Sequence, residues 1–393
     1  MIADPPPSRT KNGRIRPLSA ATYLVRNAGR TIPLTGVIML AVVLIAGIVA
    51  LMNSIPLSIR TTYSYSKYSL GMVPRGSGEL SLNILAKLGH ESPVPIERVV
   101  KCRASGCQVK SIVGKWPFIV LGMNRPDIEY FLKRLGARSL DGRLPTKGKP
   151  EAVVSEPVAR NLGLKLGSTL LSPTDQDNYS PHTVKVVGIA NTNEWVMLDD
   201  IEYQRENHFP PVDNLMIFAH DLQQQDVLDR WAVKTFKGDR TLVFAYFILE
   251  KETTENFQTL YAILDVVIGV LVLVITIMMG MLINIYQSQR LVEFGLLQAI
   301  GYTKRQLLQR VMRETMWVLV LGWCLGIVCS YVLLIAADKT LMHPHAYALQ
   351  TLDPVALRYT IPVPLSILLV ASLTVWLRFR KFDPVGVVER RLV

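Results

Sequence analysis

Residues 290–326 read RLVEFGLLQAIGYTKRQLLQRVMRETMWVLVLGWCLG and lie between two long apolar runs. The stretch opens with a basic residue, continues with the pattern of an amphipathic helix, breaks at Gly301 and restarts as a basic helix. After Glu314 it becomes apolar for long enough to enter a bilayer. A structured, positively charged helix in a short loop between two membrane spans indicates a docking element for a partner on the cytoplasmic side.

The apolar residues of the whole chain are gathered into blocks. Hydrophobic residues make up 50% of the 393 positions, which is high for a chain in which 19% of the residues are charged. Four blocks reach the roughly 20 residues that a helix needs to cross a bilayer. They cover approximately residues 32–52, 260–286, 315–337 and 359–377. The sequence therefore predicts an α-helical membrane protein with four transmembrane helices.

The charges beside these blocks predict the orientation of the chain. Basic residues outnumber acidic ones in residues 1–31, 287–314 and 378–393. By the positive-inside rule these segments are cytoplasmic, so both termini face the cytoplasm of a multi-pass protein in the plasma (inner) membrane. The formal net charge of +12 is thereby explained without nucleic acid as a partner.

The expected organisation follows from this pattern. Residues 1–31 form a cytoplasmic tail, in which residues 17–30 are either a helix on the membrane surface or a plain basic flank. Residues 32–52 are the first span. Residues 53–256 lie outside and form a large α+β domain, because short β-like runs alternate there with helix-like pieces. The β-like runs are residues 117–122, 151–155, 168–172, 183–190 and 215–219, and the helix-like pieces are 125–135, 156–162 and 221–234.

Catalytic motifs are missing from the sequence. It contains no G-x-x-x-x-G-K-[ST] phosphate-binding loop, no H-E-x-x-H, no G-x-S-x-G and no Cys–His ligand cluster. We therefore expect neither catalytic residues nor a metal site, and ATP hydrolysis would need a separate subunit. A membrane enzyme, as a third class of function, has no supporting residues.

Two cysteines fall in the segment expected outside, within KCRASGCQ at residues 101–108. An oxidising compartment would permit a disulfide between Cys102 and Cys107. We predict this bridge, with two free thiols or an incomplete metal site as the alternatives.

The stretch quoted above resembles the FtsX-like permease domain of type VII ABC transporter permeases. The residues that carry this resemblance are Arg290, Glu293, Gly295, Leu296, Ala299, Ile300, Gly301, Lys304, Arg305, Glu314, Gly322 and Gly326. Residues 382–385 resemble the family's terminal Asp-Pro-Val element, and residues 151–190 resemble a MacB-like extracytoplasmic core. Residues 63–115 match no known pattern. The segment 338–358 is longer than the hairpin that joins the last two spans in MacB-like permeases, which leaves room for it to pack under the outer domain.

The resemblance implies roles for particular residues. Residues 257–393 would be the FtsX-like permease domain, with a coupling helix at about 291–301. The residues expected to couple it to an ATPase are Glu293, Gly295, Leu297, Ala299, Gly301, Lys304 and Arg305. Gly322 and Gly326 have the spacing of a small-xxx-small motif, which favours close packing against another helix.

The resemblance also implies partners and a function. The partners would be a cytoplasmic ABC ATPase dimer, which binds ATP and Mg, and a second permease copy or a paralogue. A periplasmic adaptor protein can belong to the same assembly. The favoured function is a permease subunit that moves or extracts an amphiphile (a peptide, lipid, lipoprotein or drug) by mechanotransmission. The alternative is a non-transport regulator that controls an outer partner such as a cell-wall hydrolase.

Overall fold

The computed structural model describes residues 27–75, 80, 82–207 and 212–380. Most of the expected surface helix at 17–30, and the Asp-Pro-Val element at 382–385, lie outside the described residues. The chain divides into two compact units. We call Met1–Val49, Ile263–Leu334 and Leu352–Val393 the helical unit, and Ala50–Ala262 with Ile335–Thr351 the α+β unit.

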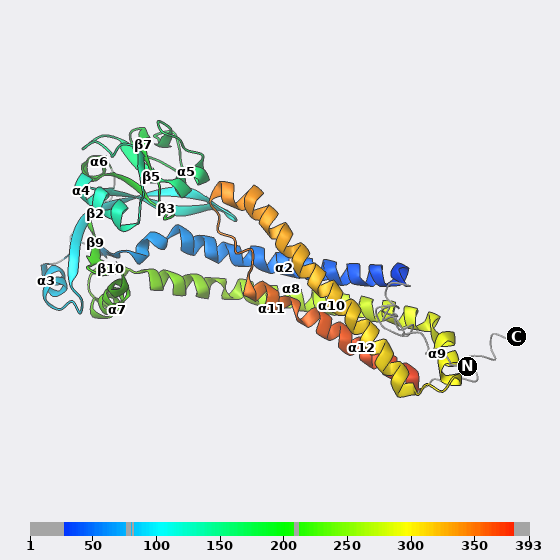
Figure 1. The fold of residues 1–393 in the computed structure, drawn as a ribbon. Coiled ribbons are helices and arrows are strands. Elements are labelled where there is room, and N and C mark those ends of the chain that lie inside the picture. The colour runs from blue at the N-terminus through cyan, green and yellow to red at the C-terminus, as the bar shows by residue number, and fades with distance from the viewer. Residues whose placement is uncertain (1–26, 76–79, 81, 208–211, 381–393) are drawn as a thin grey trace, which may run out of the picture. The chain divides into compact units, whose positions relative to one another are not determined.

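Long helices dominate the fold (Figure 1). In the described part of the chain, four segments are long and apolar enough to cross a membrane, namely Thr31–Thr62, Tyr246–Gln289, Lys304–His345 and Pro354–Arg378. They contain the helices α2 (Ala28–Thr62), α8 (Tyr246–Gln289), α10 (Lys304–Ala337), α11 (Pro354–Thr360) and α12 (Pro362–Arg380). The predicted fold class, four apolar helices with an α+β domain between the first two, is confirmed.

The helices extend well beyond the apolar runs from which they were predicted. α8 has 44 residues, which corresponds to about 66 Å at about 1.5 Å per residue, twice the hydrocarbon thickness of about 30 Å. Its first residues belong to the α+β unit and its last to the helical unit. A continuous helix of this length therefore links the two units directly.

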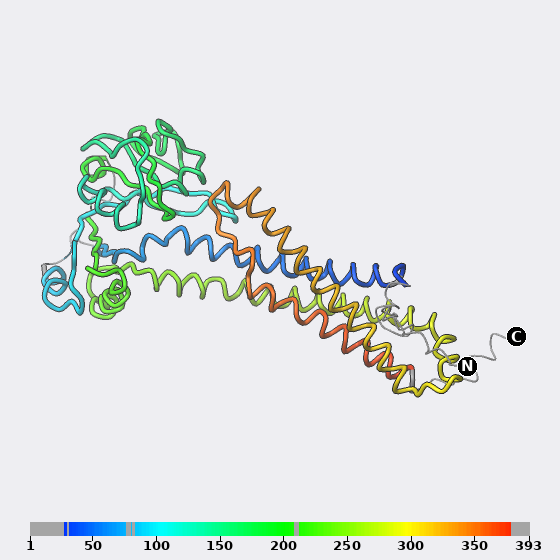
Figure 2. Tube along the Cα trace, viewed as in Figure 1, coloured from blue at the N-terminus to red at the C-terminus, as the bar shows by residue number. Residues whose placement is uncertain are grey.

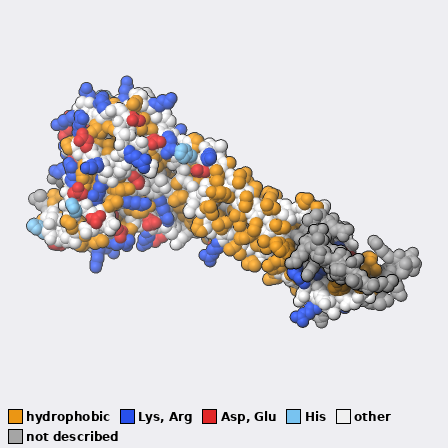
Figure 3. Space-filling view, in the orientation of Figure 1, with side chains coloured by type: hydrophobic (Ala, Val, Ile, Leu, Met, Phe, Trp, Pro, Cys, Tyr) orange, Lys and Arg blue, Asp and Glu red, His pale blue; other side chains and the backbone are white. Residues whose placement is uncertain are grey.

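The surface of the spans is apolar in the view of Figure 3. Val266 is 67% exposed and Leu369 is 66% exposed, although both lie within predicted spans. In water such a surface would be costly, whereas in a bilayer it meets lipid chains of the same polarity. The exposed side chains are therefore consistent with helices that cross a membrane.

Within its described residues, the α+β unit is built on one ten-stranded sheet. Its strands are β1 (Leu70–Pro74), β2 (Ile96–Ser111), β3 (Gly114–Met123), β4 (Leu140–Gly142), β5 (Glu151–Ser155), β6 (Thr169–Leu171), β7 (Val184–Ala190), β8 (Met197–Asp200), β9 (Asn214–Ala219) and β10 (Thr241–Phe244). The order is β10-β1-β9-β2-β3-β8-β5-β7-β4, and β6 also pairs with β7. The 16-residue strand β2 pairs first with β9 and then with β3, so it joins two halves of the sheet.

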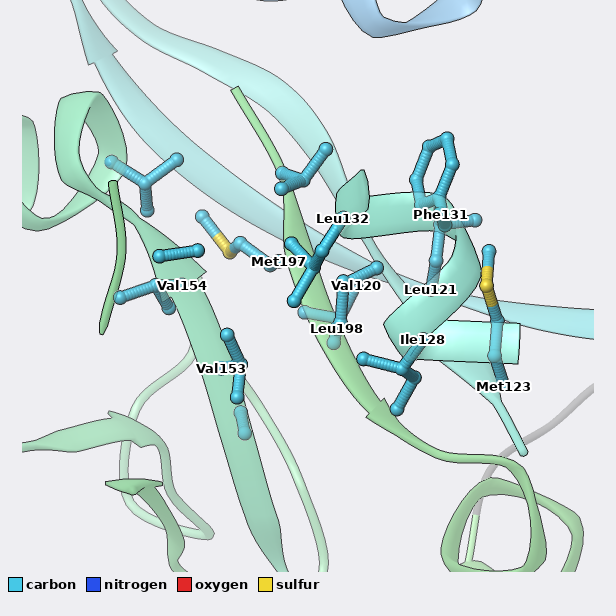
Figure 4. Close-up of a cluster of buried hydrophobic side chains, with 14 of the residues drawn as sticks. Val120, Leu121, Met123, Ile128, Phe131, Leu132, Val153, Val154, Met197 and Leu198 are labelled. Carbon is cyan, nitrogen blue, oxygen red and sulfur yellow. The ribbon is translucent and has the colours of Figure 1, made fainter. Parts of the chain in front are cut away.

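Each half of the sheet has its own core. In one half, side chains of β3, β5 and β8 converge with those of α4 (Arg125–Arg134), as Figure 4 shows for Val120, Val153, Leu198 and Phe131. In the other half, β1 and β9 pack against α3 (Leu82–His90) and α7 (Gln225–Thr235). The remaining helices are α5 (Glu156–Leu162) and α6 (Ile201–Asn207). The structure contains the helix and the strands that the sequence predicted, with ends that differ from the prediction by at most three residues. The predicted helix is 156–162, and the predicted strands are 117–122, 151–155, 168–172, 183–190 and 215–219.

The predicted Cys102–Cys107 disulfide is wrong. Both cysteines are free and buried on β2. Five residues of extended strand separate their Cα atoms by about 16 Å, whereas a disulfide needs about 7 Å or less. The alternative of two free thiols is the one that the structure supports, because the segment is a strand rather than a tight loop.

Burial predicts how these thiols react. Desolvation raises the pKa of Cys102 and of Cys107 to about 12, so neither forms the reactive thiolate at neutral pH. We expect iodoacetamide to leave both unmodified in the folded protein and to alkylate both after unfolding, without any reductant. Mass spectrometry of the peptides measures this, and a cysteine introduced at the exposed Val227 of α7 (Val227→Cys) is the reactive control. A peptide pair joined through Cys102 and Cys107 in the untreated protein would contradict the assignment.

A buried carboxyl on α7 predicts a pH dependence of stability. Burial raises the pKa of Asp229 from 3.8 to about 7, an effect that nearby Asp226 reinforces and that the amide of Gln225 and the charge of Arg230 oppose. The native state therefore binds this proton more tightly than the unfolded chain does. The protonated carboxyl contributes stability that is fully present below about pH 4 and is lost as the pH rises through about 7. The shift corresponds to about 4 kcal/mol at about 1.4 kcal/mol per unit.

The replacement Asp229→Asn should remove this penalty. The new side chain keeps an oxygen for the hydrogen bond that Gln225 donates, 2.9 Å long in the structure, but carries no charge. We expect a higher unfolding temperature than wild type at pH 8 and no difference at pH 4, measured on the full-length chain in nanodiscs. An equal change at both pH values would show that the carboxyl does not titrate between them.

Candidate functional site

The loop between α8 and α10 folds as the short helix α9 (Leu291–Ala299). Arg290 separates α8 from α9, and a turn at residues 300–303 separates α9 from α10. Gly301 has φ +105° in this turn, a conformation that residues with a side chain rarely adopt. Its backbone N–H donates to the carbonyl of Gln298 at 2.9 Å, so the glycine ends the helix and reverses the chain, as its position in the sequence indicates.

A network of four charged side chains holds this loop to the start of α10. The Arg290 guanidinium lies 2.7 Å from the Glu314 carboxylate and 2.9 Å from that of Glu293. Arg310 also reaches both carboxylates, Glu314 at 3.1 Å and Glu293 at 3.7 Å. The side chains of Arg290 and Glu314 are only 4% and 6% exposed. Charges buried to this degree are stable only as a pair, so the network fixes α9 relative to α10.

An apolar cluster lies next to the network. Phe294 is buried against Leu307 and Val311 of α10 and Val375 of α12. The Arg290 guanidinium lies 5.0 Å from the centre of the Phe294 ring, which adds a cation–π contact. Leu297 packs against the same cluster. The inner side of α9 is thus apolar and fixed to the helical unit.

The opposite side of the loop is open to solvent and partly apolar. Ile300 is 76% exposed, and Leu296, Ala299 and Tyr302 are exposed beside it. The basic residues Lys304 and Arg305 are exposed as well. We call these six residues the coupling face. Large apolar side chains on a solvent-exposed turn are typical of a surface that another protein covers.

The residues named from the sequence therefore divide into two groups. Ala299, Lys304 and Arg305 lie on the coupling face, and Gly301 shapes the turn beneath it. Glu293 belongs to the charge network, and Gly295 and Leu297 are buried or half-buried on the inner side. The exposure of Leu296 and Ile300 and the pairing of Arg290 with Glu314 were not recognised as features of this site.

A signal for the ion pair is present in the sequence, although it is weak. Arg290 is the first charged residue after the second apolar run, and Glu314 is the last before the third. Charged residues at the ends of two adjacent spans face each other when the spans are antiparallel. The pairing could have been proposed on that basis, but the sequence alone does not distinguish it from two residues that each face lipid headgroups.

Gly322 and Gly326 lie where α10 crosses α2. A Cβ atom added to Gly322 would stand 2.9 Å from Cβ of Ile38, and one added to Gly326 would stand 2.6 Å from Cβ of Val42. Both distances are shorter than carbon atoms tolerate. The two glycines let the helices approach closely, and their partner, which the sequence did not identify, is the first span.

The segment after α10 contains two histidines, His343 and His345. In the described residues, no group of three or more His, Cys, Asp or Glu side chains is arranged to hold a metal ion. His343 lies 3.1 Å from a nitrogen of Arg160, and the backbone carbonyl of His345 accepts a hydrogen bond from Asn161. Residues 335–351 belong to the α+β unit rather than to the helical unit.

Solved structures that are similar to this chain include the following two. One is the periplasmic region of MacB from Actinobacillus actinomycetemcomitans, with 12% identity over 48% of this chain and 93% of that chain and a TM-score of 0.27. The other is the extracellular domain of the noncanonic ABC-type transporter YknZ from Gram-positive bacteria, with 13% identity over 45% and 98% and a TM-score of 0.25. No curated protein matches the sequence.

The family comparison covers the part of the chain that contains the site. Residues 266–384 match the model of the FtsX-like permease C-terminal family. The matched segment includes most of α8, the whole of α9 and α10, and α11 and α12. The charge network, the coupling face and both packing glycines all lie inside it. Residues 266–384 of this chain are an FtsX-like permease C-terminal domain.

Proposed function

We propose that the chain is the membrane-spanning subunit of an ATP-driven ABC transporter that moves or extracts an amphiphile by mechanotransmission. The observation that carries this proposal is the build of α9: one side is locked by the buried charge network, and the other presents an exposed apolar coupling face. A helix that is held rigidly on one side and exposes apolar side chains on the other is suited to receive force from a protein that binds it.

In this proposal the partner is a cytoplasmic ABC ATPase dimer, which supplies the ATP and Mg chemistry that this sequence has no motif to perform. Ile300, Leu296 and Ala299 enter a groove of the ATPase, and Lys304 and Arg305 pair with acidic groups at its rim. A second copy of the chain, or a paralogue, occupies the second ATPase, and an adaptor protein can complete the assembly outside an inner membrane.

Force would pass through continuous helices. ATP binding draws the ATPases together and moves α9, and the charge network passes this motion to the base of α10. The unbroken α8, 44 residues long, carries it towards the α+β unit. The substrate is an amphiphile because the surfaces in reach are the membrane and the α+β unit, and Asp265 is the one charged residue in the four apolar blocks of the sequence.

The proposal predicts that a charge on the coupling face abolishes coupling. Ala299→Glu places a desolvated carboxylate in an apolar contact, and the loss should resemble that of a binding hot spot, about 2 kcal/mol or more. This corresponds to at least a roughly thirtyfold weaker association. The measurement is the amount of ABC ATPase that co-purifies with the full-length chain from its native membrane, together with the rate of ATP hydrolysis in nanodiscs.

Gln309→Glu is the matched control, since it adds the same charge at an exposed position of α10 outside the coupling face. We expect the control to recruit and stimulate the ATPase as wild type does. Normal recruitment and normal hydrolysis with Ala299→Glu would mean that α9 is not the coupling element.

A further inference from the structure

The hairpin between β2 and β3 ends in an apolar tip. Its sequence, residues 110–116, is KSIVGKW. Val113 is 59% exposed at the turn, and Gly114 has φ +118°, which makes the turn tight. Ile112 and Trp116 flank it half-buried. Exposed apolar residues next to Trp and between lysines are typical of segments at a membrane–water interface.

One buried side chain fixes the hairpin to the end of the third span. Asn161 of α5 donates from its amide nitrogen to the carbonyl of His345 at 2.8 Å and to that of Lys110 at 3.0 Å. Its amide oxygen accepts from the N–H of Lys110 at 2.9 Å. All three residues belong to the α+β unit. Lys110 and His345 therefore lie at the same level, and Figure 2 shows the cyan hairpin ending beside the orange turn that follows α10.

A second contact gives the direction in which the hairpin runs. The hydroxyl of Tyr63, just beyond the end of α2, donates to the carbonyl of Pro117. Ser58, five residues closer to the membrane on α2, exchanges hydrogen bonds with Ala348, near His345. Pro117 is thus level with the far end of α2, whereas Lys110 is level with residues nearer the membrane. The hairpin descends towards the bilayer, and its tip lies beyond Lys110.

The distances place the tip at the lipid headgroups. The apolar run of α10 ends at Ala337, and the eight residues from there to His345 span about 12 Å along a helix. Lys110 lies at the level of His345, and one or two strand residues follow it at about 3.3 Å each. The tip therefore extends about 5 Å from the level of His345 towards that of Ala337. It therefore stands about 7 Å from the hydrocarbon, within the headgroup layer, which is about 5–8 Å thick. Leu341, in the turn between these levels, is also exposed.

We propose that the β2–β3 tip, residues 112–116, rests in the headgroup layer of the leaflet that borders the α+β unit and contacts phospholipid directly. Ile112 and Val113 enter the layer, and Lys110 lies beside the phosphates. Lys115 is held by Asp177 and contributes less charge. This inference depends on the position of the spans and not on the ATPase partner, so it stands or falls independently of the proposed function.

The experiment places a fluorophore at the tip of the full-length protein. Cys324 and Cys329 are replaced by alanine, Val113→Cys is labelled with an environment-sensitive NBD group, and the buried Cys102 and Cys107 remain as unreactive reporters of the folded state. The labelled chain is placed in phosphatidylcholine–phosphatidylglycerol nanodiscs that contain, or lack, phospholipid with a nitroxide on its headgroup. The matched control is Val227→Cys, an exposed valine on α7 of the same unit.

We expect the nitroxide lipid to cause a loss of NBD emission at position 113 and none at position 227. Emission at 113 that is unchanged by the nitroxide would overturn the proposal and would place the tip in water or under another protein. Equal loss at both positions would overturn it as well, because the quenching would then not be specific to the tip.

Discussion

Replacing Arg290 with methionine is expected to destabilise the helical unit by about 3 kcal/mol, the lower end of the cost of removing one partner of a buried ion pair. The reason is that Glu314, only 6% exposed, would lose its 2.7 Å partner and keep only the contact to Arg310. Glu293 would lose its 2.9 Å contact to Arg290 and keep only the longer one, 3.7 Å, to Arg310 of α10. Thermal unfolding in nanodiscs measures the loss, and the yield of folded protein should fall with it.

The second replacement, Glu314→Met in the same chain, serves as the control. Two apolar side chains of similar volume leave no buried charge without a partner, and such exchanges are often neutral. We expect the double variant to recover most of the stability that Arg290→Met loses. A double variant as unstable as the single one would show that the ion pair itself, and not the isolated charge, sets the stability.

Gly326→Leu is expected to force α2 and α10 apart. A Cβ at this position would already lie 2.6 Å from Val42 Cβ and 3.0 Å from the carbonyl of Met39, and the backbone of a helix cannot give way locally. Overpacking of this kind costs about 1–3 kcal/mol or more. The expected result is a lower unfolding temperature and a loss of the contact between the first and third spans, measured by cysteine cross-linking between them.

Gly269→Leu on α8 is the matched control, because nothing lies within 4 Å of a Cβ added there. It makes the same change in the same membrane environment, and we expect wild-type stability and cross-linking. If both variants lost stability equally, the cause would be the larger side chain in general and not the close crossing at Gly326.

The sequence predicted those parts of the fold that depend on local pattern. Apolar runs identified the four spans, and Gly301 marked the end of α9, because helix length and left-handed turns have strong local signatures. The strand at 151–155 and the helix at 156–162 followed for the same reason. The ends of the long helices were missed, since polar residues such as those at 246–259 continue α8 once the span has nucleated it.

Features that depend on distant residues were predicted less well. Arg290 and Glu314 are 24 positions apart, and only the antiparallel arrangement of two spans brings them together. Cys102 and Cys107 are close in sequence but far apart in space, because β2 continues through both. The position of the hairpin at 110–116 could not be predicted for the same reason. It depends on contacts with Asn161 and His345, which lie far along the chain.

The central claim is that α9 is the element to which an ABC ATPase binds. Site-specific cross-linking tests this claim most directly. A photoreactive amino acid is placed at Ile300, on the coupling face, or at Leu297, three residues earlier on the inner side. The full-length chain is irradiated in its native membrane, and adducts are identified by mass spectrometry. We predict an ATPase adduct from position 300 and only adducts within the chain from position 297. No ATPase adduct from position 300, with the chain folded and present in the membrane, would contradict the account.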